Sequence, residues 1–482
     1  MSAQTKSADY YNGIILGMLN GNVLLQPFDS TIANRNVFVA GGPGSFKTQS
    51  FVITNILHEQ KCSILCTDPK GEVYESTSEI KRKQGYDVYV VNFKDMRYSC
   101  HYNPFDYVRR DNDAAKVANT IVASKNDTKN KDIWYNSQVS LLKALVLLAI
   151  YEFPVKKRNV GGVLEFLQDH NPEEDESGLA EIDEFFLNLN SRHPARRAYD
   201  LGFGKSKDKT RSSIVISLLT TLGDFVDNEV EDFTSNSDFL LSELGERKII
   251  VYVLIDIMDS TWEGLVNLFF QQCFQELYKL GNANKAKLPN PLFILLDELP
   301  SLGKFENLEE FLATCRGYGI ACCPMVQHIT QLYAKYNKDK AESMVGNCCV
   351  KLCMGGVNDT TAKYFSELIG KSTVRIDTGS NSVSKGKNNS SSSKSDSYTY
   401  AGRSLMNPDE ISTMENDTSL CIINGKHPIK LKKAKQFELF PGIVDRYMVS
   451  QESYQRTTSK KAKAFFEELK LKEERGEKKW VG

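Results

Sequence analysis

Short, wholly apolar runs occur in two separate parts of the chain, each bounded by glycine or polar residues. In the first part they predict buried strands at 36–40, 63–67 and 87–91. In the second part they predict strands at 249–254, 291–296, 319–326, 347–354 and 419–423. After the first run, residues 49–58 place Phe51, Val52 and Ile56 on one side of a helix. Strand, loop, helix and strand in this order is the pattern of a parallel sheet, so we expect one sheet built from both parts.

The segment between the two groups of strands has the spacing of helices. Helices are predicted at 114–124, 133–153, 161–169, 179–190 and 212–225. We therefore expect an α/β fold, with a mainly parallel sheet formed by residues 1–110 and 244–440 and an all-α domain inserted at 111–243. Residues 139–151 are strongly apolar, but the run is short and contains Lys143, so a buried core helix is favoured over a membrane span.

Two segments lack the pattern of a packed core. Residues 379–398 consist mainly of Ser, Asn, Lys and Gly, a composition that cannot bury apolar surface, and we expect a disordered loop. Residues 441–482 form a charged C-terminal tail, in which charges of both signs surround Phe465, Phe466 and Leu469. That pattern indicates a solvated helix, and docking to a partner is the alternative.

Composition narrows the class of protein. The 482 residues are 41% hydrophobic and 25% charged, as in ordinary globular proteins. Lys and Arg number 60 against 61 Asp and Glu, so a nucleic acid would have to meet a local basic patch or an oligomeric channel. The 11 cysteines show no Cys-x-x-Cys spacing, which disfavours a zinc site and fits a reducing compartment. The first residues lack the apolar stretch of a signal peptide, and we expect a soluble, cytoplasmic chain.

A glycine-rich loop follows the strand at 36–40 and precedes the helix at 49–58. Its residues are Gly41, Gly42, Pro43, Gly44, Ser45, Phe46, Lys47 and Thr48. A phosphate-binding loop (P-loop) needs inward-turned backbone N–H groups, a Lys for the β- and γ-phosphates and a Ser or Thr hydroxyl for Mg²⁺. The loop therefore predicts binding of ATP and Mg²⁺, and a tight Gly-Pro-Gly turn is the alternative. Phe46 departs from the pattern GxxxxGK[ST], which has glycine there, and brings a ring close to the phosphate path.

The buried strand at 291–296 ends in two carboxylates, Asp297 and Glu298. In a P-loop enzyme an acidic pair at this position serves the reaction. Asp297 would hold Mg²⁺ together with Thr48, and Glu298 would orient or deprotonate the attacking water. Such a pair alone is often a solvated turn. With a P-loop upstream it indicates a nucleoside triphosphatase.

Arg316 and Gln327 complete the candidate catalytic residues. Arg316 begins a glycine-rich turn into the strand at 319–326, from which it could reach the phosphates of a neighbouring subunit as an arginine finger. Gln327 ends that strand, where it could sense the γ-phosphate or the attacking water. The alternatives are a surface arginine and a strand-end glutamine bonded to the backbone.

Taken in order, these elements resemble a known family. The resemblance rests on the P-loop, Asp68-Pro69-Lys70, Tyr102-Asn103-Pro104-Phe105, Lys209-Thr210-Arg211, Asp297-Glu298, Arg316, Gln327 and the segment 403–410. The chain is similar to type IV secretion system coupling proteins, the TraG/TraD-like conjugative DNA transfer ATPases, in the form found in Gram-positive mobile elements. The resemblance spans residues 36–435.

The resemblance implies a RecA-like P-loop NTPase domain, interrupted by the all-α domain and assembled as a homo-hexamer. It implies an ATP-driven motor that recruits relaxase-bound single-stranded DNA and moves it to the type IV secretion channel at the cell membrane. By position, residues 41–48 bind nucleotide, Thr48 and Asp297 hold Mg²⁺, and Glu298, Arg316 and Gln327 are catalytic. The loop 68–70 is expected near the nucleotide edge or the pore.

The family pattern leaves two alternatives and one open question. Family members usually carry N-terminal transmembrane helices, whereas this chain starts shortly before the motor domain, so we expect partners to provide the membrane contact or the chain to be a shortened homologue. A scaffold of the same family with weak or no turnover, caused by Phe46, is one alternative function. A RecA-like DNA translocase of another system is the other.

Candidate contacts to the DNA backbone are Lys205, Lys207, Lys209 and Arg211, with a solvated loop as the alternative.

Overall fold

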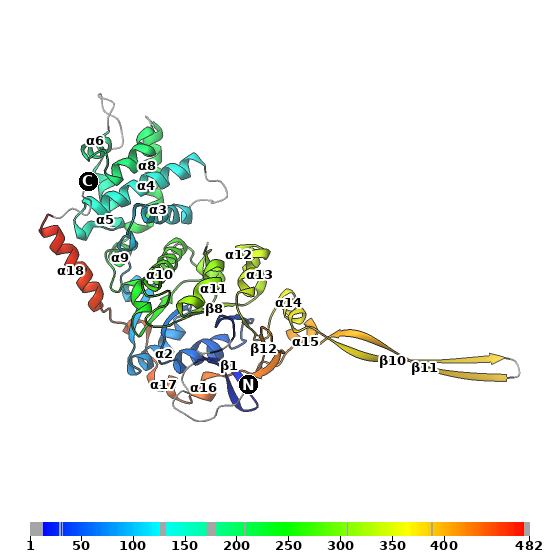
Figure 1. The fold of residues 1–482 in the computed structure, drawn as a ribbon. Helices are drawn as coiled ribbons and strands as arrows, with labels where there is room; N and C mark the ends of the chain where they lie inside the picture. Colours follow the sequence, from blue (N-terminus) through cyan, green and yellow to red (C-terminus); the bar gives the residue numbers. More distant parts are fainter. Residues whose placement is uncertain are drawn as a thin grey trace.

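The computed structural model describes residues 13–27, 30, 32–125, 132–170, 180–206, 209–305, 307–386 and 389–476. Figure 1 shows three parts: a domain built around a large sheet, a helical domain beside it, and a long two-stranded arm that projects away from both.

One sheet of eleven strands, in the order β2-β1-β13-β12-β9-β3-β8-β7-β4-β6-β5, forms the centre of the larger domain. Its strands are β1 (Gly13–Leu19), β2 (Asn22–Pro27), β3 (Val37–Ala40), β4 (Ser63–Asp68), β5 (Asp87–Asn92), β6 (Ile249–Leu254), β7 (Leu292–Leu296), β8 (Ile320–Val326), β9 (Val350–Cys353), β12 (Thr418–Ile423) and β13 (Ile429–Lys432). Neighbours from β9 to β5 pair in parallel, and β12, β13, β1 and β2 extend the sheet antiparallel. The predicted mainly parallel sheet, assembled from both parts of the chain, is confirmed.

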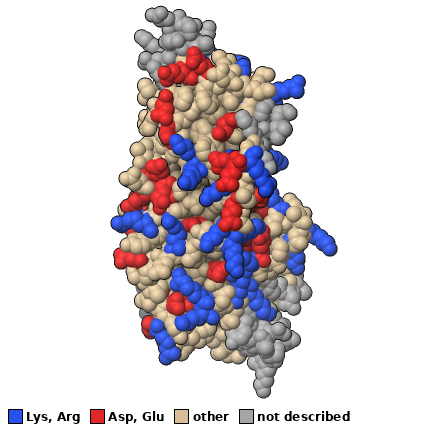
Figure 2. Space-filling view, turned by 90° about the vertical axis from the view of Figure 1, so that its left-hand side faces the viewer, with Lys and Arg blue, Asp and Glu red and all other residues tan. Residues whose placement is uncertain are grey.

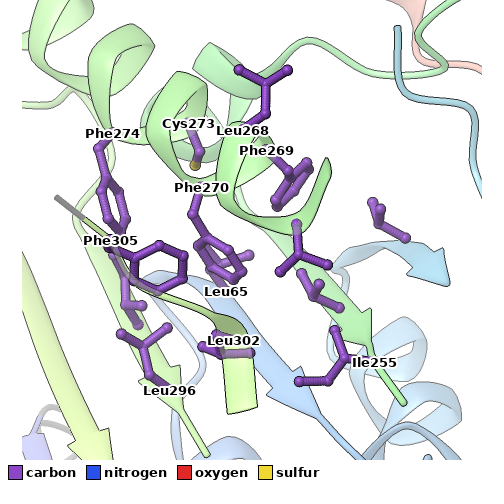
Figure 3. Close-up of a cluster of buried hydrophobic side chains, with 14 of the residues drawn as sticks. Leu65, Ile255, Leu268, Phe269, Phe270, Cys273, Phe274, Leu296, Leu302 and Phe305 are labelled. Atoms are coloured by element: carbon purple, nitrogen blue, oxygen red, sulfur yellow. The ribbon is translucent and has the colours of Figure 1, made fainter. Parts of the chain in front are cut away.

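Helices cover both faces of this sheet, which explains why its central strands are apolar throughout. The turn of π-helix η2 (Thr48–Val52), α1 (Ile53–His58) and α2 (Glu72–Lys83) follow β3 and β4. The later crossovers contain α10 (Glu263–Ala283), α11 (Leu308–Thr314), α12 (Ile329–Tyr336) and α13 (Lys338–Gly346). Right-handed crossovers that run in opposite directions along the sheet place these two groups on opposite faces. In Figure 3, Phe270 and Phe274 of α10 point toward Leu296 and Phe305, and the rings of Phe270 and Phe305 lie 5.1 Å apart.

The helical domain lies between β5 and β6 in the sequence. It contains α3 (Asp111–Lys125), α4 (Ile133–Glu152), α5 (Val160–Asp169), α6 (Glu181–Asn188), α7 (Pro194–Leu201), α8 (Lys209–Leu222) and α9 (Asn228–Phe233). Among the described residues, α4 is the one helix long and apolar enough to cross a membrane. Of its most apolar 18-residue stretch, 61% is buried inside the protein, because α3, α5, α7 and α8 pack around α4.

The Ser- and Asn-rich segment 379–398, predicted to be disordered, lies within a hairpin instead. Strands β10 (Lys371–Gly386) and β11 (Asn389–Ser404) pair antiparallel along their whole length. The hairpin leaves the sheet domain beside α14 (Asp359–Ile369) and α15 (Pro408–Ser412) and extends into solvent (Figure 1). Within the described residues, the two strands satisfy each other's backbone groups without a packed core.

The charged C-terminal segment runs back along the molecule. Its helices are α16 (Gln436–Leu439), α17 (Ile443–Tyr447) and α18 (Lys460–Glu474). Helix α18 is mostly exposed, yet it touches the helical domain, where the Val155 N–H donates to Glu473 Oε2 at 3.3 Å. It also touches the segment before α3, where the Arg109 guanidinium lies 5.3 Å from the Phe465 ring centroid. The face on this side of the molecule carries Lys and Arg interspersed with Asp and Glu (Figure 2).

Candidate nucleotide site

The loops that carry the candidate residues meet at the carboxyl edge of the sheet. Strands β3, β8 and β7 are consecutive neighbours, with Ala40 opposite Val326 and Leu296 opposite Pro324. The P-loop, Gln327 and the Asp297–Glu298 pair follow these strands directly. Since parallel strands end at a common edge, all three loops lie side by side, where ligands bind in open α/β sheets.

The P-loop is held in shape by backbone contacts to neighbouring strands. The Gly41 N–H donates to Val326 O at 3.1 Å, and the Gly42 N–H donates to Gly355 O at 3.0 Å. A Cβ on Gly42 would lie 1.8 Å from the carbonyl oxygen of Gly356, so glycine is required there by this close approach. The loop passes directly into η2 and α1, whose N-terminal N–H groups favour an anion.

Five predicted site residues come together around this loop. Lys47 Nζ lies 3.7 Å from Glu298 Oε1 and also donates to the Gly41 carbonyl. Gln327 Nε2 donates to the same Glu298 oxygen at 3.0 Å. Thr48 Oγ1 donates to Asp297 Oδ2 at 3.3 Å. A lysine, a threonine hydroxyl, two carboxylates and a side-chain amide are therefore within one cluster.

Burial controls the acidity of the carboxyl groups at this edge. It raises the pKa of Asp297 to about 6, an effect that the Glu298 charge increases and that Lys47 and Thr48 oppose. Burial also raises the pKa of Asp68 to about 7. Asp68 ends β4 and accepts the N–H groups of Gly71 and Tyr74, both at 2.8 Å, so it closes the loop 68–70 on itself at the carboxyl edge.

Glu298 is held in an unusual backbone conformation. Its φ is 52° and its ψ is 49°, the left-handed region that residues with a side chain rarely adopt. The turn into η9 (Leu299–Leu302) imposes this conformation, and it aims the carboxylate at Lys47 and Gln327. Backbone strain of this kind, about 1–3 kcal/mol, is concentrated at functional sites.

Phe46 keeps the backbone shape that the motif normally obtains from glycine. Its φ is 60°, at a cost of about 1–2 kcal/mol for a residue with a Cβ. Its partly exposed ring faces Lys435, whose Nζ lies 4.7 Å from the ring centroid. The ring is thus directed toward the segment after β13.

Arg316 does not join this cluster. It lies in the turn η10 (Cys315–Tyr318), which precedes β8, at the amino edge of the parallel strands, and it is exposed. The parallel strands therefore separate it from the P-loop of its own chain.

The expectation that Arg211 contacts DNA is wrong. Its side chain is 3% exposed and lies 2.8 Å from Asp183 Oδ1 and 3.0 Å from the Tyr199 hydroxyl, inside the helical domain. Lys205 is exposed, and Lys207 lies outside the described residues.

Sequence reasoning missed Lys433, whose side chain donates a hydrogen bond to the backbone of the P-loop. The residue is 1% exposed, and its Nζ donates to the carbonyls of Ser45 at 2.9 Å, Met354 at 2.7 Å and Asn416 at 2.6 Å. Burial lowers its pKa to about 8. Lys433 lies in a lysine-rich run at 430–435, and nothing in such a run distinguishes a buried lysine from its exposed neighbours.

The residues present fit a magnesium nucleotide. Mg²⁺ is usually held by one or two protein oxygens together with phosphates and water, and Thr48 and Asp297 supply such oxygens. The P-loop amides and Lys47 suit the phosphates. Among the described residues, no cluster of three or more His, Cys, Asp or Glu forms a separate metal site.

Comparison with protein families gives a match over most of the chain. The family model for type IV secretory system conjugative DNA transfer matches residues 5–465. The chain is 25% identical over 390 residues to the protein VirD4 of Rhizobium radiobacter, covering 78% of this chain and 53% of VirD4. It is 26% identical over 333 residues to the conjugal transfer protein TraG of Escherichia coli, covering 65% of this chain and 51% of TraG. The chain thus spans about half the length of these relatives.

Solved structures with the same fold include the plasmid coupling protein TrwB. In complex with the ATP analogue ADPNP, TrwB superposes with a TM-score of 0.62 at 16% identity, over 90% of this chain and 91% of TrwB. In complex with ADP and Mg²⁺ the TM-score is 0.61 at 15% identity, over the same shares of both chains. The predicted RecA-like P-loop NTPase fold is confirmed.

Proposed function

Because this chain belongs to the type IV secretory system conjugative DNA transfer family, we propose that it is a coupling ATPase that moves relaxase-bound single-stranded DNA toward the secretion channel. The observation that carries the proposal is the cluster of Lys47, Thr48, Asp297, Glu298 and Gln327 at one edge of the sheet. These groups suit the hydrolysis of ATP, and TrwB, a solved protein of the same fold, binds ADPNP and ADP with Mg²⁺.

Each residue of the cluster has a role that its position supports. The P-loop amides and Lys47 bind the phosphates, and Thr48 and Asp297 hold Mg²⁺, which when bound offsets the negative charge of the phosphates. Glu298 orients the attacking water and accepts its proton. The Gln327 amide, 3.0 Å from Glu298, fixes that carboxylate and faces the water.

Arg316 acts on a neighbouring subunit in this proposal. Its place at the amino edge of the strands keeps it away from its own P-loop, and its exposure leaves it available to another copy. An arginine supplied in trans offsets the charge of the transferring phosphoryl group. We therefore propose a homo-hexameric ring that carries DNA and lies at the cytoplasmic face of the membrane, where partners hold it.

The geometry of Phe46 favours an active ATPase over a scaffold of the same family. A blocking residue would direct its ring into the phosphate path. Here the φ of 60° preserves the loop and the ring faces Lys435. The match to a conjugative family over residues 5–465 disfavours a DNA translocase of another system.

The test is ATP hydrolysis by the purified full chain, with and without single-stranded DNA. We expect turnover that DNA increases and that Lys47→Ala abolishes. The matched control is Lys363→Ala, an exposed lysine of α14, which should leave turnover unchanged. Absence of both ATP binding and turnover, with both appearing in Phe46→Gly, would favour the scaffold. DNA transfer in cells that survives Lys47→Ala would refute the motor.

A further inference from the structure

The two sides of the P-loop differ in chemistry. The groups suited to hydrolysis, Asp297, Glu298 and Gln327, follow β7 and β8 on one side. On the other side lie β9, β12 and β13 and the segment that follows β13. A nucleotide with its terminal phosphate at Glu298 must therefore leave the loop with its ribose and base toward β12 and β13.

That second side is attached directly to the P-loop. Asn416 Nδ2 donates to Gly44 O at 3.3 Å. Gln436, the first residue of α16, donates through Nε2 to Gln49 Oε1 at 3.2 Å, and Gln49 directly follows Thr48. The position of α16 is therefore fixed relative to the start of the P-loop helix.

A cation between two aromatic rings lines this side. Lys435 Nζ lies 4.7 Å from the ring centroid of Phe46 and 5.6 Å from that of Phe437, and its charge is paired with Asp417. Phe437 is 46% exposed although Gln436, beside it, is 8% exposed. A large apolar ring is thus presented to solvent from a fixed backbone.

Of the three residues of this group, Lys435 also lines a cavity. A cavity of about 340 Å³ lies between the β1–β2 turn and α16, and Lys435 and Glu438 line it. Its size is within the range of small-molecule sites.

We propose that Phe46, Lys435 and Phe437 form a nucleoside shelf, on which Phe437 stacks against the purine base of ATP while Phe46 contacts the ribose. The inference rests on the proposed nucleotide binding and extends it to the base. It gives Phe46 a use: the residue that departs from the P-loop pattern supplies an aromatic surface for the nucleoside. Lys435, whose charge is paired with Asp417 and Glu438, holds both rings in place.

The experiment compares the binding of ATP with that of inorganic triphosphate, both with Mg²⁺, to the full chain by calorimetry. Triphosphate needs the P-loop and not the shelf. We expect Phe437→Ala to weaken ATP about tenfold, the usual worth of one base stacked on an aromatic ring, and to leave triphosphate unchanged. Phe46→Gly should also reduce the ratio of ATP to triphosphate affinity. Ile443→Ala in α17, a residue 39% exposed, is the matched control and should change neither affinity.

The outcomes separate this inference from the proposed function. If both ligands bind and neither Phe437→Ala nor Phe46→Gly changes their affinity ratio, the shelf is refuted while nucleotide binding stands. If the unmodified chain binds neither ATP nor triphosphate, the proposed function fails and the shelf fails with it. A loss of triphosphate binding equal to the loss of ATP binding in Phe437→Ala would show damage to the P-loop and would also overturn the shelf.

Discussion

Lys433 offers a direct measure of how much one buried cation stabilises the P-loop. Its ammonium joins three chain segments through the carbonyls of Ser45, Met354 and Asn416, at 2.6 to 2.9 Å. The side chain is 1% exposed, so water cannot replace it easily. With a pKa of about 8, the group is mostly charged at pH 7.

The substitution Lys433→Met keeps the length of the side chain and removes its donors. Each buried carbonyl left without a donor costs about 1–3 kcal/mol, and loss of the buried charge returns part of this. We expect the free energy of unfolding of the sheet domain to fall by about 2–4 kcal/mol. We also expect faster hydrogen exchange in the P-loop, because Ser45 loses its anchor.

Urea denaturation followed by fluorescence, together with hydrogen exchange of residues 41–48, measures both effects. Lys432→Met is the control, because Lys432 belongs to the same strand but is exposed and pairs with Glu438. The control should change stability by less than about 0.5 kcal/mol. Equal stability of the two variants, or an unchanged exchange rate in the P-loop, would refute the reasoning.

Three further predictions address the site and the arm. Burial raises the pKa of Asp297 from 3.8 to about 6, so the stability that this group contributes is greatest below pH 4 and is lost as the pH rises through 6. Without nucleotide, the Asp297→Asn variant should therefore have a higher melting temperature than the unmodified chain at pH 7.5, and this difference should disappear at pH 4. A difference in melting temperature that does not change with pH would contradict the assignment. Arg316→Ala should reduce ATP turnover about a thousandfold with unchanged ATP affinity, and mixing with Lys47→Ala subunits should recover part of it; no recovery on mixing would argue against action in trans. Replacing residues 375–400 with a two-residue turn between the paired Val374 and Ala401 should change the free energy of unfolding by less than about 1 kcal/mol, and a larger loss would mean that the arm packs on the core.

The parallel part of the sheet could be predicted because its strands are buried on both faces. Such strands are short apolar runs, and β3, β4, β6, β7 and β8 were found in this way. Of the antiparallel strands, β12 was predicted at 419–423, whereas β1, β2 and β13 were not. Strand β13 carries lysines at alternate positions, and β1 contains two glycines. Edge strands of this kind are recognised from their partners and not from their own composition.

The candidate site could be predicted in part for a related reason. Motif residues at strand ends, such as Lys47 and Asp297, are recognisable because the chemistry fixes their types and order. Arg316 was also recognised, but its distance from the P-loop follows from the direction of β8, which only the sheet topology gives. Lys433 could not be recognised at all, since its role depends on three carbonyls from distant segments.

The pairing of β1 with β13 has a consequence for biosynthesis. Met18 lies opposite Lys432, so one edge of β1 receives its partner only when nearly the whole chain has left the ribosome. Until then the first hairpin can rest on α1, where Asn55 bonds the Ile15 backbone, with its other edge open to wrong pairing. Nascent chains halted before residue 429, where β13 begins, should therefore be the most prone to aggregate. A chaperone that covers the open edge of β1 would be needed most at that stage.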